Sequence, residues 1–191
     1  MKRLALATGI LALAAPLALA QTSTWTSDPA HSEVDFSIRH LGISNVHGRF
    51  GNVAATIVLN DADISKSTVT ATIDVTTVDT GVSKRDNDLK SAGFFEVANF
   101  PTAAFTSTSI VKNGSNLTVT GNLTLRGITK PVVLNVEGPG ATVQGMDHKS
   151  HVGFSAITTI SRSAFGVGTS YSPSVLGDDV KLTIELDVAK P

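Results

Sequence analysis

The 191-residue chain contains no cysteine. It therefore forms no disulfide bond and offers no thiolate as a nucleophile or as a metal ligand. Large aromatic residues are also scarce, because the chain has one tryptophan, one tyrosine and eight phenylalanines. The fold must be stabilised without covalent cross-links, by a core that is built mostly from aliphatic side chains.

Basic residues are not in excess, since 15 lysines and arginines stand against 16 acidic residues. They also form no long run along the chain. Binding of DNA or RNA depends strongly on basic side chains that contact the phosphates, so we expect no nucleic-acid partner.

The first twenty residues resemble a secretory signal peptide. Two basic residues precede an apolar run that ends in Ala18-Leu19-Ala20, the small-x-small pattern that signal peptidase accepts. The run is short for a membrane span and contains Pro16, which makes a retained anchor the less favoured alternative. We expect residues 1–20 to be removed and residues 21–191, beginning at Gln21, to form one secreted domain.

Segments in which apolar and polar residues alternate predict β-strands, because successive side chains of a strand point to opposite faces. Such segments cover residues 33–40, 46–59, 67–78, 102–111, 117–125, 132–136, 152–160 and 180–188. The second segment changes parity near Gly51, where we expect a bulge. Short turns such as Asn113-Gly114-Ser115 join the segments, as in antiparallel neighbours. The pattern predicts an all-β, eight-stranded antiparallel barrel, with an interior that is filled or holds one small ligand.

A single stretch between these strands has the features of a helix. Ser83 and Asp86 resemble a capping pair, and Gly93 is placed to end a helix of about two turns. We therefore expect a short helical insertion near residues 83–92, followed by two adjacent phenylalanines. Such an insertion either lines an opening of the barrel or plugs its core, and the sequence leaves both alternatives open.

Three of the five histidines lie close together in the sequence. His40 has the parity of the apolar residues of strand 33–40 and faces inward if the strand extends that far. His31 precedes the strand and His47 follows a chain reversal, so we do not expect the three to meet at one metal ion. No His-x-His pair is present, and we predict no metal site. His40 is either a structural group or a polar contact to a ligand inside the barrel.

Motifs for catalysis are missing, since no Gly-x-Ser-x-Gly sequence occurs. Arg162 is the charged residue of most interest, because it shares the inward parity of Phe154. A buried guanidinium is costly without a partner. Arg162 therefore either pairs with an acid at the end of the barrel or binds the polar or anionic head group of a ligand.

Several stretches, in this order, resemble the YceI-like family of polyisoprenoid-binding, lipocalin-like periplasmic proteins. They are VDFSIRHLGISNVHGRF at residues 34–50, LKSAGFFEVANFPTAAFTS at 89–107, GNLTLRGITKPVVL at 121–134 and SRSAFG at 161–166. The resemblance implies a periplasmic, lipocalin-like barrel around an elongated apolar ligand, such as a polyisoprenoid, an isoprenoid quinone or a fatty-acid amide. It implies no catalytic group and no cofactor, and it is compatible with transient membrane contact and with a homodimer.

The inward parity and the resemblance together give a set of expected ligand-binding residues. They are Val34, Phe36, Ile38, His40, Phe50, Phe94, Phe95, Phe154, Arg162 and Phe165. Two alternatives to a lipid carrier stay open on the sequence alone. One is a secreted hydrolase or isomerase that uses His40, and the other is a stress-related structural protein with a filled barrel.

Overall fold

The structure is a computed structural model in which residues 22–190 are described. The expected signal peptide, residues 1–20, lies outside the described residues. The elements are β1 (Thr22–Ser27), β2 (Glu33–His40), β3 (Ser44–Phe50), β4 (Val53–Asn60), η1 (Ile64–Lys66), β5 (Thr68–Asp74), η2 (Val75–Thr77), α1 (Ser83–Lys90), β6 (Thr102–Asn113), β7 (Asn116–Leu125), β8 (Ile128–Glu137), β9 (Val143–Gln144), β10 (Ser150–Ser161), η3 (Ser163–Phe165) and β11 (Leu176–Ala189). Here η marks a short 3-10 helix.

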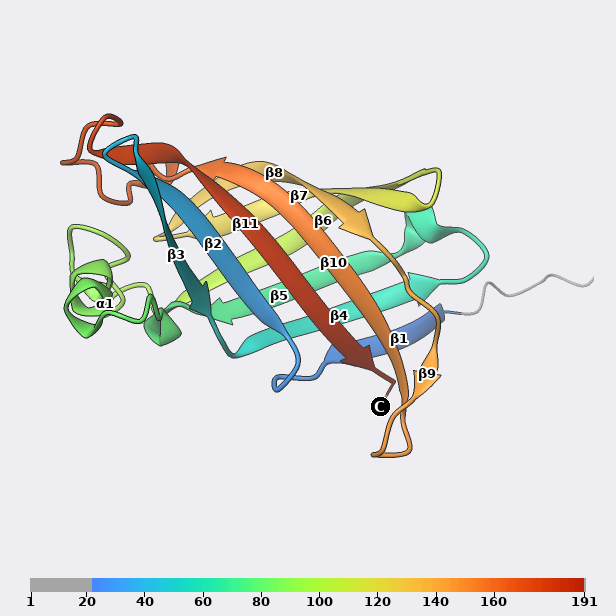
Figure 1. Ribbon diagram of the computed structural model, residues 1–191. Helices are drawn as coiled ribbons and strands as arrows, with labels where there is room; N and C mark the ends of the chain where they lie inside the picture. The colour runs from blue at the N-terminus through green and yellow to red at the C-terminus, as the bar shows by residue number, and fades with distance from the viewer. Residues whose placement is uncertain (1–21, 191) are drawn as a thin grey trace, which may run out of the picture.

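The last strand, β11, closes the barrel because it is paired along both of its edges (Figure 1). One edge pairs with β10, and the other pairs first with β2 and then, near the end of β11, with β1. From β1 the ring continues through β4, β5, β6, β7 and β8 to β10. All of these pairings are antiparallel, which confirms the predicted eight-stranded antiparallel barrel.

Two interruptions in the strands shape one end of the barrel. A turn at Asp28 and Pro29 separates β1 from β2, and the chain leaves the strand at Gly51 and Asn52 between β3 and β4. Asn52 has a positive φ of 52°. The bulge expected near Gly51 is thus a complete break, and among the described strands β3 pairs along its length with β2 alone. A single bridge from Arg49 to Asp79 connects this hairpin to the segment after β5.

The helical insertion is present, but its caps differ from the prediction. The N-cap residue of α1 is Val82, which makes no side-chain capping bond. Ser83 and Asp86 do not form a capping pair, because the Asp86 carboxylate accepts hydrogen bonds from the backbone N and the Oγ1 of Thr80, at 2.9 and 2.6 Å. The helix is followed by Ser91 as its C-cap, two residues before Gly93.

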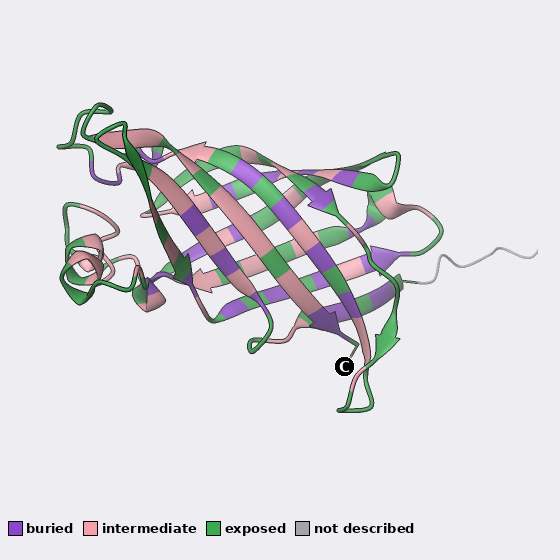
Figure 2. Ribbon diagram, viewed as in Figure 1, coloured by how far each residue is buried: buried purple, intermediate pink, exposed green. Residues whose placement is uncertain are grey.

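Buried side chains alternate with exposed ones along the strands, as the sequence pattern predicted (Figure 2). They form two clusters inside the barrel. The larger cluster contains Trp25, Ile57, Leu59, Phe105, Ile110, Leu117, Val119, Leu123, Val136, Val152, Phe154, Ala156, Phe165, Val167 and Val188. The smaller cluster contains Val34, Phe36, Phe50, Val53, Val75, Val78 and Ala103.

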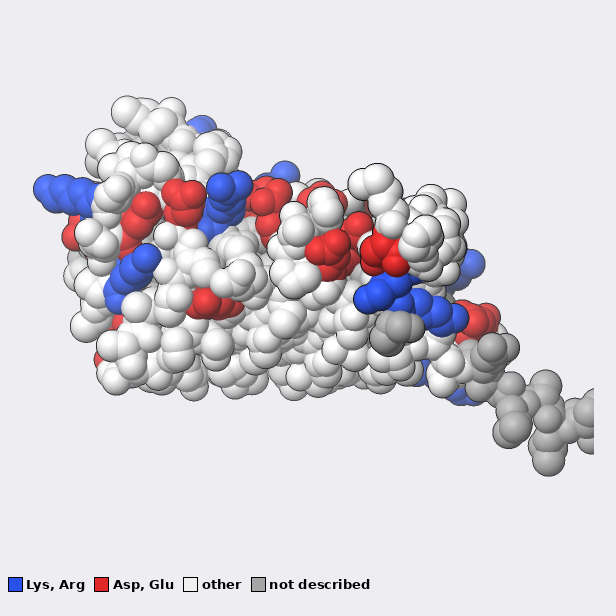
Figure 3. Space-filling model, turned by 90° about the horizontal axis from the view of Figure 1, so that it is seen from below, with Lys and Arg blue, Asp and Glu red and all other residues white. Residues whose placement is uncertain are grey.

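The outer surface of the barrel carries charges of both signs. On the face seen in Figure 3, basic and acidic side chains are interspersed, and a broad area is uncharged. Among residues 22–190, no helix has the length and the apolar composition needed to cross a bilayer.

Candidate functional site

A cavity of about 430 Å³ lies inside the barrel, next to α1. Single small ligands occupy cavities of about 300–1,000 Å³, so this one is large enough to bind a ligand. The residues that line it are Val34, Phe36, Ile38, His40, Val46, Phe50, Ile73, Val75, Arg85, Asp88, Leu89, Phe94, Phe95, Ala103, Leu123, Leu125, Ile160, Arg162, Val167, Tyr171, Val175, Leu176, Val180 and Leu182. Most of them are aliphatic or aromatic, so the wall is apolar.

Eight of the ten expected ligand-binding residues line this cavity. They are Val34, Phe36, Ile38, His40, Phe50, Phe94, Phe95 and Arg162. The structure places Phe154 and Phe165 in the larger core cluster instead. Phe154 is opposite Leu186 in the β10–β11 pair, and Phe165 is 1% exposed. Inward parity was right for Phe154, but parity does not distinguish the filled part of a barrel from the hollow part.

Aromatic rings form one wall of the cavity. The Phe50 ring packs against Phe36, with ring centroids 5.4 Å apart, and against Phe95, with centroids 5.5 Å apart and an interplanar angle of 77°. A Cβ atom on Gly48, across from Phe36, would lie 2.4 Å from the Phe36 ring, so this glycine gives the ring its room. Phe95 also packs against the core clusters. The insertion, through Arg85, Asp88 and Leu89, thus lines the cavity, and Phe95, which follows it, both lines the cavity and covers the core.

Arg162 is buried, with 4% exposure, and its guanidinium faces backbone carbonyls. Nε donates to Gly177 O at 2.9 Å, Nη1 to Val167 O and Gly168 O at 2.9 and 2.6 Å, and Nη2 to Tyr171 O and Leu176 O at 2.8 Å each. A guanidinium has five N–H donors, so these five bonds use all of them. Neither a head group nor an acid is needed as the partner of Arg162. Its role is to fix the loop between η3 and β11, which forms part of the cavity wall.

Besides Arg162 and Tyr171, the polar side chains on the cavity wall come from β2 and α1. His40 ends β2, and Arg85 and Asp88 lie on α1. Arg85 donates from Nε to Thr80 Oγ1 at 2.8 Å and from Nη2 to Thr80 O at 3.0 Å. Within residues 22–190, its Nη1 group makes no hydrogen bond. The sequence did not single out Arg85 or Asp88, because a charged residue on an exposed short helix carries no signal of its own.

The three clustered histidines lie apart, as their parities predicted. His40 lines the cavity, while His47 is exposed on β3 opposite Ser37. His31 lies in the β1–β2 turn, where its Nδ1 is 3.0 Å from Asp28 Oδ2. A fourth histidine, His151 on β10, contacts two carboxylates. Its Nδ1 is 2.7 Å from Asp187 Oδ1, and its Nε2 is 3.0 Å from Asp147 Oδ1.

These contacts raise the pKa of His31, through the Asp28 carboxylate, and that of His151, through Asp187 and then Asp147. A histidine with a raised pKa in the folded state stabilises the fold fully below its unfolded pKa of about 6.5, and this stabilisation is lost as the pH rises through the raised value. We therefore expect the free energy of unfolding, measured by urea denaturation with a chelator present, to fall between pH 6 and pH 8.

The variant His151→Ala tests the origin of this pH dependence. It should show a smaller fall over the same range, whereas His47→Ala should retain the wild-type fall. An unchanged pH dependence in both His151→Ala and His31→Ala would contradict the assignment to these two histidines.

The chain is similar to known proteins of one family. The profile of the YceI-like domain matches residues 25–188. The protein YceI of Salmonella arizonae is 40% identical over 159 residues, which is 82% of this chain and 81% of that protein.

Solved structures show the same fold. A YceI protein from Campylobacter jejuni superposes with a TM-score of 0.71 at 35% identity, over 80% of this chain and 90% of that one. BcnA of Burkholderia cenocepacia superposes with a TM-score of 0.74 at 26% identity, over 84% and 98%. A polyisoprenoid binding domain from Saccharophagus degradans superposes with a TM-score of 0.64 over 90% of this chain and 100% of that one. Its sequence identity is 17%, so the similarity is evidence for the fold and not for the function.

Proposed function

The chain belongs to the YceI-like family, and from this premise we propose that it is a periplasmic carrier that holds one elongated lipid inside its barrel. The ligand would be a polyisoprenoid, an isoprenoid quinone or a fatty-acid amide. The observation that carries the proposal is the cavity of about 430 Å³ with its largely apolar wall.

The chemistry of the wall favours an aliphatic or prenyl chain over a polar guest. Each methylene that moves from water into such a cavity contributes about 0.8 kcal/mol of binding free energy, so a long chain needs few polar contacts. His40 and Arg85 are the polar groups that we propose for orienting the head of the ligand, since both line the cavity. Within residues 22–190 the Nη1 group of Arg85 donates no hydrogen bond, so its two N–H groups can donate to a ligand.

Apolar side chains also lie on the surface next to the cavity. Leu41 and Ile43 at the β2–β3 turn are 51% and 79% exposed, and Val82 before α1 is 47% exposed. The β2–β3 turn is tied to the cavity wall, because Leu41 N donates to Val175 O at 2.9 Å. We propose that these side chains contact a membrane transiently while a lipid enters or leaves the barrel.

For the membrane contact, we expect Ile43→Asp to slow lipid transfer between vesicles severalfold without loss of fold, because Ile43 is mostly exposed. Met146→Asp is the matched control, since Met146 is a fully exposed apolar residue on the distant β9–β10 turn. Transfer is measured with a fluorescent prenyl lipid in donor vesicles. Equal rates in both variants would show that the β2–β3 turn does not contact the membrane.

The first experiment for the proposed function is native mass spectrometry of the mature protein, purified from its own periplasm without detergent. Extraction with organic solvent then identifies any molecule that is released. A stoichiometric prenyl lipid, quinone or acyl amide is the expected result. A bare mass that stays unchanged after incubation with these lipids would overturn the proposal.

A catalytic function based on His40 has less support in the geometry. Such a mechanism needs an acidic side chain to orient the imidazole. Within residues 22–190 no carboxylate forms an ion pair or a hydrogen bond with His40, whereas His31 and His151 do have such partners. We therefore assign His40 to ligand contact.

A further inference from the structure

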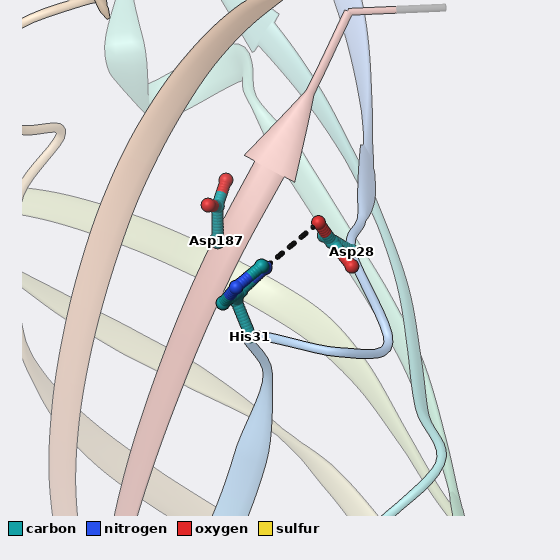
Figure 4. A group of neighbouring side chains, drawn as sticks. All are labelled: Asp28, His31 and Asp187. Atoms are coloured by element: carbon teal, nitrogen blue, oxygen red, sulfur yellow. Dashed lines mark hydrogen bonds and ion pairs between the residues drawn. The ribbon is translucent and has the colours of Figure 1, made fainter. Parts of the chain in front are cut away.

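Three side chains that are far apart in the sequence converge where the β1–β2 turn meets the end of β11 (Figure 4). Asp28 and His31 come from the turn, and Asp187 comes from β11. One carboxylate oxygen of each aspartate and one ring nitrogen of His31 all lie within 4.8 Å of one another. None of these residues lines the lipid cavity.

The backbone holds this group in place. Asp28 N donates to Asp187 O at 2.7 Å, and Ser32 Oγ donates to the same carbonyl at 3.2 Å. Inside the turn, Ala30 N donates to Asp28 Oδ1 at 2.8 Å and His31 N donates to Asp28 O at 3.2 Å. These bonds hold the backbone of the turn next to the backbone of β11, so the three side chains start from neighbouring positions.

His151 provides an outer contact to the group. Its Nδ1 is 2.7 Å from Asp187 Oδ1, and its Nε2 is 3.0 Å from Asp147 Oδ1. A histidine–carboxylate contact of this kind orients a metal ligand and tunes its basicity in many metal sites. A surface hollow of about 520 Å³, lined by His31, His151 and Asp187, gives solvent and ions access.

The local charge favours a cation. Three carboxylates, Asp28, Asp147 and Asp187, surround two histidines, and within residues 22–190 their side chains form ion pairs with histidine alone. Lys190, which follows β11, lies instead over the Trp25 ring at 5.5 Å. In the part of the chain that the structure describes, no lysine or arginine forms an ion pair with these carboxylates, and the nearby charge of Lys149 acts on Asp147, which is outside the proposed ligand set.

From this geometry we propose that Asp28, His31 and Asp187 bind one Zn²⁺ ion, with water as a fourth ligand and His151 as the group that orients Asp187. Zinc takes imidazole nitrogen and carboxylate oxygen at about 2.0–2.2 Å, so two tetrahedral ligands lie about 3.4 Å apart. The 3.0 Å contact between His31 and Asp28 has to open slightly to reach this spacing, and the other separations, all within 4.8 Å, have to adjust to it. The ion would join the β1–β2 turn to β11 at a distance from the lipid site.

The test is isothermal titration of the mature, tag-free protein with Zn²⁺ alone, after treatment with a chelator. We expect one ion per chain, and at least about tenfold weaker binding in His31→Ala and in Asp187→Asn. His31→Ala changes an exposed side chain and should keep its far-UV circular dichroism, so the test does not depend on the fold of Asp187→Asn. His47→Ala is the matched control, because it removes another exposed histidine and should bind as the wild type does.

Two results would overturn the proposal. One is a wild-type protein that binds no Zn²⁺. The other is a wild-type affinity that His31→Ala retains or that His47→Ala reduces equally, which would indicate adventitious binding to surface histidines. Neither result bears on the lipid site, which does not share these residues.

Discussion

We expect the variant Ile38→Glu to lose binding of the lipid that we propose for the cavity. Ile38 lines the cavity on the inner face of β2, so the substitution places a carboxylate against the apolar chain of the ligand. A charge in such surroundings is strongly unfavourable unless it is paired. We predict an affinity for a prenyl lipid that falls at least about 100-fold, or about 2.7 kcal/mol, in a fluorescence displacement titration.

The neighbouring residue supplies the control for this experiment. Ser37→Glu introduces the same side chain on the opposite face of the same strand, where Ser37 is paired with His47. This variant should bind lipid as the wild type does. A second variant, Ala103→Phe, reduces the cavity volume without adding charge, because Ala103 is buried and lines the cavity. Undiminished binding in both Ile38→Glu and Ala103→Phe would show that the lipid does not occupy this cavity.

The second large effect is expected at Arg162. Replacing it with leucine removes five hydrogen bonds and leaves three carbonyls of the loop before β11, and those of the first two residues of β11, without their donor. Buried polar groups that lose their partner each cost about 1–3 kcal/mol, although loop relaxation recovers part of this. We therefore predict a loss of about 3–5 kcal/mol in the free energy of unfolding, measured by urea denaturation.

Arg162→Lys separates the charge from the hydrogen-bonding geometry. Lysine keeps the positive charge but has three donors at one point, which cannot reach carbonyls spread around a planar guanidinium. We expect it to restore less than half of the lost stability. Arg39→Leu is the control, since Arg39 is an exposed arginine on β2. If Arg162→Leu were as stable as Arg39→Leu, the loop would not depend on this guanidinium.

The strands and the direction of their side chains could be predicted because they depend on a local property. Alternation along residues 33–40 placed Val34, Phe36 and Ile38 on the buried face, and the structure has them there or on the cavity wall. Two strands were missed: the short β9 and, within the closed ring, β1, where TSTWTS contains a single large apolar residue. Its strand character comes from pairing with β4 and β11, which alternation cannot show.

The candidate site was predicted only in part, for a related reason. Parity says which side chains face the interior, but it does not say how far a distant strand fills that interior. Phe154 and Phe36 have the same pattern in the sequence and both are buried in core clusters, yet Phe36 lines the cavity and Phe154 does not. The partner of Arg162 was also beyond reach, because it is a set of backbone carbonyls and not a side chain.

The sequence by itself determined the all-β class, the antiparallel order of most strands, the position of the helical insertion and the family. These features follow from the spacing of apolar residues, from turn residues and from ordered motifs. The tertiary structure alone decided where the barrel is hollow, what Arg162 binds and that Asp28 and His31 meet Asp187. Each of these depends on contacts between segments that are far apart in the chain, and only ring closure through β11 sets their distances.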